Sequence, residues 1–229
     1  MRDMLGWLEV TNPSSVHSTN YGLRDKYTVT WLDECEPYLK WKSGGTMLLH
    51  LYGIPRAGKS VVFSSMVENL RLECLEKPVG YHTTAYYYCL YSRQQGETLP
   101  SLRSIISQLC RQSKTVPEIL YHIWNSRDEP SLGILIESLQ TLVDQFRHVF
   151  VMIDALDESQ QRQNMLQLLG LISELDMPQP SLLATSRDEV DIEGSLGDID
   201  NKARIPMDNK YVRGDIRKFL IHQLERAFL

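Results

Sequence analysis

The sequence predicts an α/β domain in which helices cover both faces of a mainly parallel β-sheet. Short apolar runs that are typical of strands alternate with longer segments of helical periodicity along most of the chain. The apolar runs are nearly continuous, as expected for strands that are buried on both faces. Three of the runs are followed by polar segments with chemically distinctive residues. Ligands bind at such strand ends in open α/β sheets, so these segments are the first candidates for a functional site.

Five segments are predicted as the strands of this sheet. The first is the apolar run TMLLHLY at 46–52, and the second, HTTAYYYCLY at 82–91, is rich in the threonine and tyrosine that strands favour. The third, HVFVMID at 148–154, is a solid apolar run that ends in an acid. SLLATS at 181–186 is the fourth strand, and ARIPM at 203–207 is a weaker fifth.

Helices are predicted between and around these strands. One or two are expected between Leu23 and Trp41, and another begins at Thr98, which we expect to cap it, with Pro100 in its first turn. Further helical segments are 60–75, 117–126, 131–146, 159–175 and 209–229, the last interrupted by Gly214. Residues 1–22 contain TNPSSVHSTNYG and are interpreted as an N-terminal linker or extension, and the acidic stretch after 186 is interpreted as a loop.

The composition is that of an ordinary globular chain. Of its 229 residues 42% are hydrophobic and 23% are charged, and the formal net charge is −5, which argues against a general binder of nucleic acid or anionic membranes. The four cysteines form no C-x-x-C pair and the six histidines show no metal-ligand spacing. No apolar run reaches the length of a membrane span or a secretion signal, so we expect a cytoplasmic protein with reduced cysteines.

The loop after the first strand has the pattern of a phosphate cradle. GIPRAGKS matches G-x-x-x-x-G-K-[ST] with Gly53, Gly58, Lys59 and Ser60, between a predicted strand and a predicted helix. The glycines allow backbone torsions and close approach, the backbone N–H groups surround phosphates, and the helix adds its positive end. Lys59 is expected to reach the β- and γ-phosphates. The predicted nucleotide-binding residues are Gly53, Ile54, Pro55, Arg56, Ala57, Gly58, Lys59, Ser60 and Val61.

The acids after the third strand add magnesium chemistry to this prediction. Asp154 ends the strand, where P-loop enzymes hold Mg²⁺ beside the hydroxyl of the cradle, here that of Ser60. Asp157 and Glu158 follow, and either could orient or deprotonate an attacking water. The sequence does not choose between them. Asp157 has a structural alternative as well, as the cap of a helix that begins near Ser159.

Polar residues also end the fourth strand, where LLATSRDE continues through Thr185, Ser186 and Arg187. A polar residue there could sense a γ-phosphate, and Arg187 could add positive charge near it. The alternative is a strand end with a solvated arginine. GTP is not favoured, because NKYV at 209–212 and NKAR at 201–204 both lack the acid of the N-K-x-D motif that reads guanine. ATP or dATP is therefore the nucleotide that we expect to bind.

Three segments together resemble the NACHT domain of the STAND class of signal-transducing P-loop NTPases. They are LLHLYGIPRAGKS, HVFVMIDALDES and SLLATSR, and the tandem-acid form DALDE and the TSR after the next strand are the most distinctive parts. YTVTWL at 27–32 and DNKYVRGDIRKFL at 208–220 look like fungal members, including heterokaryon-incompatibility-type proteins with ankyrin or WD repeats. The resemblance covers about residues 24 to 228.

The resemblance implies a three-layer αβα P-loop NTPase fold with strand order 5-1-4-3-2, in a NACHT domain over residues 23–229. It implies a nucleotide-controlled switch of an NLR-like protein, with ATP or ADP and Mg²⁺ as ligands, slow hydrolysis and self-association in the ATP-bound state. By position, Ser60 and Asp154 would serve magnesium, Asp157 and Glu158 would support hydrolysis, and Arg187 would be the sensor. These three last residues are the predicted catalytic set.

The chain departs from the family pattern at several points. Arg56 stands where members often have glycine, and Ser60 where they often have threonine. The helical, winged-helix and repeat parts that usually follow, and an N-terminal effector domain, are not expected here, as in a fragment, a truncated product or a minimal module. Two other functions stay open: a non-catalytic nucleotide-binding or interaction scaffold with the same fold, and a small-molecule kinase.

Overall fold

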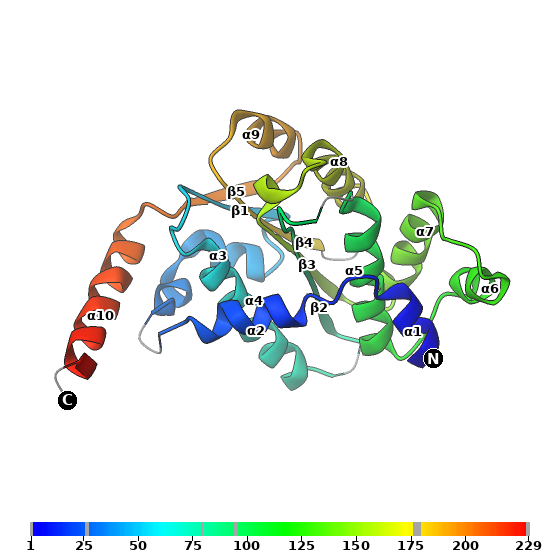
Figure 1. Cartoon of the computed structure of the whole chain (residues 1–229), viewed down its shortest axis with the longest axis horizontal. Helices are drawn as coiled ribbons and strands as arrows, with labels where there is room; N and C mark the ends of the chain where they lie inside the picture. Colours follow the sequence, from blue (N-terminus) through cyan, green and yellow to red (C-terminus); the bar gives the residue numbers. More distant parts are fainter. Residues whose placement is uncertain (1, 26–27, 79, 94–95, 176–179, 228–229) are drawn as a thin grey trace.

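The computed structural model describes residues 2–25, 28–78, 80–93, 96–175 and 180–227, and Figure 1 shows the chain. The strands are β1 (Leu48–Tyr52), β2 (His82–Tyr88), β3 (His148–Asp154), β4 (Pro180–Ser186) and β5 (Lys202–Pro206). The α-helices are α1 (Arg2–Leu8), α2 (Ser14–Gly22), α3 (Glu36–Lys42), α4 (Lys59–Glu76), α5 (Thr98–Ser113), α6 (Glu118–Ser126), α7 (Leu132–Val143), α8 (Arg162–Ser173), α9 (Val190–Gly197) and α10 (Lys210–Ala227). The short 3-10 helices are η1 (Thr30–Glu34) and η2 (Leu156–Glu158).

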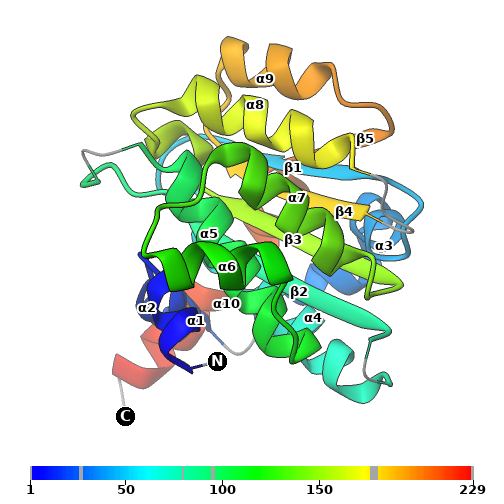
Figure 2. The ribbon, with the colours of Figure 1, turned by 90° about the vertical axis from the view of Figure 1, so that its right-hand side faces the viewer.

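All five strands pair in parallel, in the order β2-β3-β4-β1-β5. Read from the other edge this is 5-1-4-3-2, the order that the family resemblance implied, and Figure 2 shows it along the sheet. β4 therefore lies between β1 and β3. The carboxyl ends of these three strands carry the glycine loop, Asp154 and Arg187, so the segments singled out in the sequence meet at one edge of the sheet.

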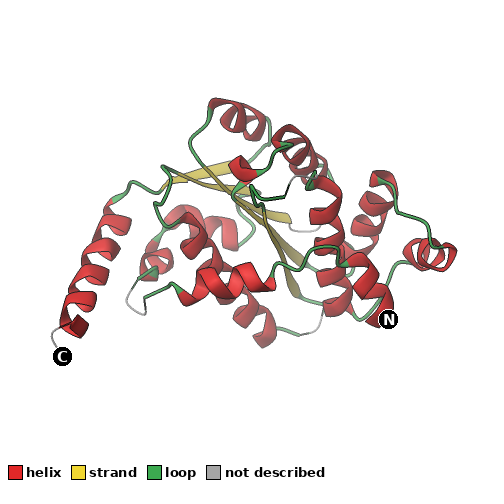
Figure 3. Ribbon diagram, viewed as in Figure 1, coloured by secondary structure: helices red, strands yellow, loops and turns green. Residues whose placement is uncertain are grey.

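Helices cover both faces of the sheet, in three layers that Figure 3 shows with helices in red and strands in yellow. Alternate strand residues enter two separate apolar clusters: Leu49 and Leu51 pack with α3 and α4, whereas Leu48 packs with α5, α7 and α8. This division explains the continuous apolar runs of the strands, because both faces are buried. The predicted α/β fold class, the five strands and the αβα layering are confirmed.

Residues 1–22, which were interpreted as an N-terminal linker or extension, contain the helices α1 and α2, and both helices pack on the domain. Leu5 and Leu8 of α1 are buried in the cluster around α5. On α2, the ring of His17 is hydrogen-bonded to the Tyr88 hydroxyl over 2.9 Å and to the Glu68 carboxylate over 2.6 Å. The hydrophobic pattern of α2 is weak, so its helix depends on these tertiary contacts more than on an apolar stripe.

Two further local expectations were wrong. The acidic stretch after β4 contains α9, which buries Ile192 and Leu196 one helical turn apart. Thr98 does not cap α5, because it already belongs to the helix and its buried hydroxyl has no hydrogen-bond partner among the described residues. Glu97 precedes the helix instead, and its carboxylate accepts hydrogen bonds from Leu90 N–H and from Arg93, which closes the loop after β2.

β2 is an edge strand, and two glutamines of α5 occupy its outer edge. Gln108 accepts from Tyr86 N–H over 3.1 Å and donates to Tyr86 C=O over 2.8 Å. Gln112 accepts from Thr84 N–H over 3.4 Å and donates to Thr84 C=O over 2.7 Å. Gln108 and Gln112 are one helical turn apart on α5. Their partners, Tyr86 and Thr84, are two residues apart on β2, so both partners face the same edge of the strand. They replace the hydrogen bonds of a neighbouring strand and block the edge against further pairing.

The cysteines and His50 lie mostly in the packed interior of the described chain. Cys35, Cys89 and Cys110 are buried free thiols and Cys74 is half-buried. His50 is buried in the sheet with its Nε2 hydrogen-bonded to the Ser186 hydroxyl over 2.8 Å, so it is a packed histidine. Among the described helices, none combines the length and the apolar character that a membrane crossing requires.

Candidate nucleotide-binding site

The glycine loop joins the end of β1 directly to the start of α4. Gly53 N–H donates to the Ser186 carbonyl over 3.3 Å, which continues the β1–β4 pairing into the loop. A Cβ on Gly53 would lie 2.9 Å from the Cβ of Met207, so this glycine is needed for packing against the chain that follows β5. Gly58 has φ +83°, a left-handed conformation that glycine adopts without strain, and it precedes the first turn of α4.

Arg56 also has a positive φ, of 63°. Side-chain-bearing residues pay a steric cost in this region, which accounts physically for a glycine at the equivalent place in many related loops. The Arg56 side chain is exposed, and the residue lines the mouth of the loop.

Lys59 is folded back onto the loop. Its Nζ donates to the carbonyls of Gly53 over 2.8 Å and Ile54 over 3.0 Å. Burial lowers the pKa of Lys59, and the nearby carboxylates of Asp157 and Asp154 oppose this effect. The ammonium group thus replaces part of its hydration with backbone carbonyls and lies in the field of the acids that end β3.

Asp154 is buried at the end of β3, and hydroxyl groups from two elements bind its carboxylate. Thr185 of β4 donates to Asp154 Oδ1 over 2.5 Å and accepts from Ala155 N–H over 2.9 Å. Burial raises the pKa of Asp154 to about 6, although hydrogen bonds from Thr185 and Ser60 and the charge of Lys59 act in the other direction. A desolvated carboxylate beside a hydroxyl is an oxygen donor set suited to a hard divalent cation, so these residues fit Mg²⁺.

The two acids after Ala155 have different environments. The side chain of Asp157 is only 5% exposed, and its carboxylate accepts from Arg187 N–H over 2.9 Å and pairs with Arg187 Nε over 2.9 Å. Glu158 is half-buried, and its carboxylate has no hydrogen-bond or ion-pair partner among the residues that the structure describes, although its backbone N–H donates to the Ala155 carbonyl over 2.9 Å. The alternative role of Asp157 as a helix cap was wrong, because α8 begins at Arg162 and Gln161 precedes it.

These side chains surround one cavity of about 410 Å³ at the carboxyl edge of the sheet. The loop contributes every residue from Pro55 to Val61, the β3 end contributes Ala155, Asp157 and Glu158, and β4 contributes Thr185 and Arg187. The structure therefore brings most of the predicted site residues together around this cavity, but Gly53, Ile54 and Asp154 do not line it. Ile54 is exposed to solvent, and Asp154 is buried. No group of three or more His, Cys, Asp and Glu side chains suited to a metal occurs in the described part of the chain.

The sequence profile of the family described as Nephrocystin 3, N-terminal matches residues 27–187 of this chain. The chain belongs to this family. The Nephrocystin 3 N-terminal match begins before η1 and ends at Arg187, so it contains β1 to β4 and all the residues around the cavity. With the glycine loop between β1 and α4 and the 5-1-4-3-2 sheet, the chain is a P-loop NTPase domain.

No curated protein sequence matches the chain. Among solved structures, it resembles the Aeropyrum pernix ORC1 protein in complex with DNA, with a TM-score of 0.48 and 16% identity over 90% of this chain and 53% of that chain. It also resembles Drosophila ORC bound to AT-rich DNA and Cdc6 (TM-score 0.44, 14% identity, 90% and 58% covered) and C. elegans PCH-2 (0.41, 16%, 93% and 48%). The chain spans about half the length of these proteins, and TM-scores this low carry no function over to it.

Sequence reasoning did not find the role of Thr185. It was noted only as one of three polar residues at a strand end, whereas it holds the Asp154 carboxylate and the backbone after it. The pairing of β3 with β4 places Ile153 beside Ala184, so the next residues of both strands are neighbours. A strand order known in advance would therefore have pointed to Thr185.

Proposed function

We propose that this chain is a NACHT-type nucleotide-binding switch domain that binds ATP or ADP with Mg²⁺ and hydrolyses ATP slowly. One observation carries the proposal: the loop from Pro55 to Val61, the acids after β3 and Arg187 converge on one cavity. In this proposal residues 23–229 form the nucleotide-binding unit, and α1 and α2 are an N-terminal extension packed on it.

The loop residues bind the phosphates. Backbone N–H groups at the start of α4 face the cavity together with the positive end of the 18-residue helix. Lys59 exchanges its carbonyl partners for phosphate oxygens, and the Ser60 hydroxyl and the Asp154 carboxylate hold the cation. Bound Mg²⁺ supplies positive charge to the phosphate oxygens. This role explains why a carboxylate is buried at Asp154, whose hydrogen bonds among the described residues come from the hydroxyl groups of Thr185 and Ser60.

The two neighbouring acids have separate roles in hydrolysis. Glu158 orients and deprotonates the attacking water, because it lines the cavity and its carboxylate is not engaged with a described partner. Asp157 positions Arg187 through its two contacts with that residue. Arg187 then stabilises charge on the transferred phosphoryl group, as a sensor of the γ-phosphate.

The finer part of the proposal is a signal-transducing NLR-like protein that self-associates, in a fungal nonself-recognition setting, in the cytoplasm and without a nucleic-acid or membrane partner. The resemblance of YTVTWL and DNKYVRGDIRKFL to fungal members of the NACHT family, together with the NACHT-like DALDE and TSR, supports it. The net charge of −5 supports the last point, since binding to nucleic acid favours a basic surface.

The test is calorimetric titration and thermal shift of the full chain with ATP, ADP and GTP, each with and without Mg²⁺. We expect adenine nucleotides with Mg²⁺ to raise the melting temperature and Lys59→Ala to remove the shift. Lys77→Ala is the matched control, because Lys77 is exposed beyond the far end of α4. A well-folded wild type whose melting temperature responds to neither ATP–Mg²⁺ nor ADP would contradict the proposal.

A non-catalytic nucleotide-binding scaffold is the second candidate. It is favoured by the engagement of two of the three cationic side chains around the cavity with the protein itself, Lys59 with backbone carbonyls and Arg187 with Asp157. Phosphate release separates the two functions. Glu158→Gln should abolish turnover while ATP binding persists, whereas equal phosphate release from wild type, Glu158→Gln and Asp157→Asn would favour the scaffold.

A further inference from the structure

His17 of α2 is a buried histidine that the proposed function does not use. It is 4% exposed, and within Ser14–Gly22, all of which the structure describes, it is the only buried side chain. Its Nε2 lies 2.6 Å from a carboxylate oxygen of Glu68 on α4, and its Nδ1 lies 2.9 Å from the hydroxyl of Tyr88 on β2. One side chain thus joins α2 to both a helix and a strand of the domain.

The carboxylate on one side of the ring fixes the direction of both hydrogen bonds. An ionised carboxylate only accepts, so Nε2 of His17 carries a proton and donates it to Glu68, which also binds Arg71 over 2.8 Å. Burial lowers the pKa of His17, although the hydrogen bond and the charge of Glu68 oppose this effect. In the neutral ring Nδ1 is an acceptor, so the Tyr88 hydroxyl donates to it and is directed towards α2.

Tyr88 is the neighbour of Asp154 across the sheet. The two residues are register partners at the ends of β2 and β3, and Cys89 N–H donates to the Asp154 carbonyl over 3.0 Å. Tyr88 and Met152 belong to one apolar cluster, and Asp154 follows Met152 by two residues, so Tyr88 and Asp154 leave the sheet on the same face. Burial raises the pKa of Tyr88, and the negative charge of Asp154 adds to this effect. The tyrosine and the carboxylate are therefore close enough to interact.

The ring of Tyr88 also packs on the beginning of α4. It meets the ring of Phe63 edge to face, with 5.1 Å between the centroids, and Phe63 is fully buried. Phe63 follows Ser60 by three residues, so the two side chains are neighbours on the surface of α4. Tyr88 thus connects His17 with the two elements that carry the proposed cation ligands, Asp154 at the end of β3 and Ser60 at the start of α4.

α2 depends on these contacts to stay on the domain. It has nine residues and a weak apolar pattern, and a helix this short is not stable alone in water. It packs against α4, as Figure 1 shows, and the ring of Tyr86 on β2 lies 4.9 Å from that of His17. Loss of the His17 contacts is therefore expected to release α2 locally, while the sheet and its core stay folded.

We propose that His17 couples the docking of α2 to the binding of nucleotide and Mg²⁺, with Tyr88 as the positioning residue that joins them. While α2 is docked, the Tyr88 hydroxyl has its acceptor and the ring stays beside Asp154 and Phe63. When α2 leaves, the hydroxyl is a buried donor without that acceptor, and it bonds to another group such as the Asp154 carboxylate, in competition with the cation. Docked α2 therefore favours bound nucleotide, and by linkage bound nucleotide favours docked α2 equally. This inference rests on the proposed function, because it needs nucleotide and Mg²⁺ at the glycine loop.

Hydrogen exchange of the full wild-type chain, followed by mass spectrometry, tests the coupling. We expect ADP with Mg²⁺ to slow the exchange of α2 amides by at least about fivefold, and ADP without Mg²⁺ to slow it less, because the coupling passes through Asp154. α6 is the internal control, since its buried Leu120 belongs to the cluster on the opposite face of the sheet, and its exchange should not change. A wild type that binds ADP–Mg²⁺ with unchanged exchange in α2 overturns the coupling and leaves the proposed function intact.

A double-mutant cycle tests the path through Tyr88. His17→Phe keeps a ring for packing but removes both hydrogen bonds, whereas Tyr88→Phe removes only the hydroxyl. We expect His17→Phe to weaken ADP–Mg²⁺ binding at least about fivefold in the wild-type background and less than about twofold in the Tyr88→Phe background. Ser18→Ala is the matched control, because Ser18 is the next residue of α2 and is exposed, so this variant should bind as the wild type does.

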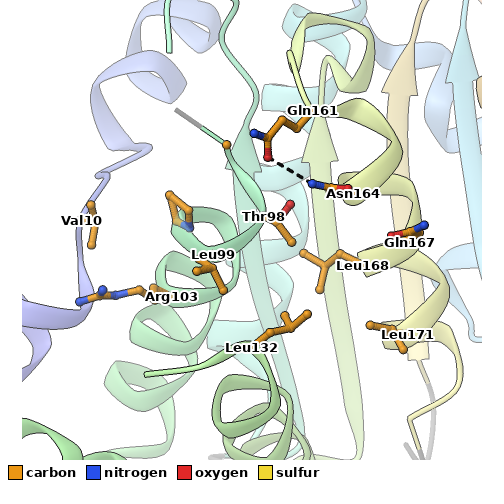
Figure 4. A pocket seen from close by; sticks show the side chains of 12 residues that line it. Val10, Thr98, Leu99, Arg103, Leu132, Gln161, Asn164, Gln167, Leu168 and Leu171 are labelled. Atoms are coloured by element: carbon orange, nitrogen blue, oxygen red, sulfur yellow. Dashed lines mark hydrogen bonds between the residues drawn. The ribbon is translucent and has the colours of Figure 1, made fainter. Parts of the chain in front are cut away.

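Leu171→Ala controls for a general loss of stability. This side chain lies on α8 in a groove of about 680 Å³, which Figure 4 shows and which neither His17 nor Tyr88 lines. We expect a lower melting temperature there with unchanged nucleotide affinity. An equal loss of affinity from His17→Phe in both backgrounds, or a similar loss from Leu171→Ala, would mean that binding follows stability alone and would overturn the coupling. A wild type that binds no nucleotide contradicts the proposed function, and the coupling with it.

Discussion

Arg56 holds a left-handed backbone conformation in the middle of the glycine loop, at φ 63°. Replacing it with glycine removes the steric cost of the side chain but increases the conformational entropy of the unfolded chain. These two effects on the free energy of unfolding are opposite in sign and of similar size. We expect Arg56→Gly to change the free energy of unfolding by less than about 1 kcal/mol and nucleotide affinity by less than about tenfold. Urea denaturation and calorimetric titration measure the two quantities.

The matched comparison is Gly58→Ala, at φ +83° in the same loop. There a Cβ meets no neighbouring atom, so the expected cost of about 1–2 kcal/mol comes from the backbone conformation alone. A loss of affinity well beyond tenfold in Arg56→Gly would mean that the guanidinium contacts the phosphates.

Asp154 has a raised pKa of about 6, because it is buried. Its folded-state pKa lies above its unfolded value, so the folded protein holds the extra proton and stability falls as pH rises from about 4 to 6. Without ligand, Asp154→Asn should therefore be more stable than the wild type above pH 6, by on the order of 1–3 kcal/mol, with the difference vanishing near pH 4. Denaturation of both proteins across pH 4–8 gives this difference directly.

The same variant should lose the Mg²⁺-dependent part of the nucleotide response, because the amide is a poorer ligand for the cation than the carboxylate. Equal stability of the two proteins at every pH would show that burial of the Asp154 carboxylate does not destabilise the folded protein.

The roles of these residues could be predicted only in part from the sequence. The spacing around Lys59 and the position of Asp154 were predictable from local pattern, whereas the pairing of Asp157 with Arg187 joins residues that are 30 apart and depends on the packing of η2 against β4.

At the scale of the elements, the edge of β2 depends on Gln108 and Gln112. Replacing both with leucine keeps the helix propensity of α5 but leaves backbone groups of Thr84 and Tyr86 without partners. We expect a loss of about 1–3 kcal/mol of stability and concentration-dependent aggregation through the opened edge. Denaturation and light scattering are the measurements.

Gln163→Leu, on the exposed surface of α8, controls for the added apolar side chain. Unchanged scattering in the double variant would show that the edge is protected by other means.

The strands of this sheet were predictable because each is a continuous apolar run. The helices α2 and α9 were not, because one lacks an apolar stripe and the other shows only Ile192 and Leu196 among acidic residues.

At the scale of the whole molecule, the N-terminal helices belong to the folded unit. Leu8 of α1 is fully buried against α5 and its neighbours, whereas Leu23, just after α2, is 65% exposed. Leu8→Ala should cost about 2–5 kcal/mol of stability, and Leu23→Ala should cost less than about 0.5 kcal/mol. Equal melting temperatures of the two variants would favour the interpretation of this segment as a linker. The Ser- and Asn-rich sequence of this segment gives little indication of a helix, because the helical structure of α2 depends on contacts with residues far away in the sequence, such as Tyr88.

The position of β4 between β1 and β3 has a consequence for how far this chain can diverge. Two inter-strand spacings separate the strands β1 and β3, which precede the glycine loop and end in Asp154, by about 10 Å across the sheet, a distance fixed by backbone hydrogen bonds. Insertions or deletions in the segments around α6 and α7 leave this gap unaltered, although they change the number of residues between Lys59 and Asp154. The number of residues between the two motifs can thus change in evolution, whereas the single strand β4 between β1 and β3 keeps the distance between the motifs in space constant.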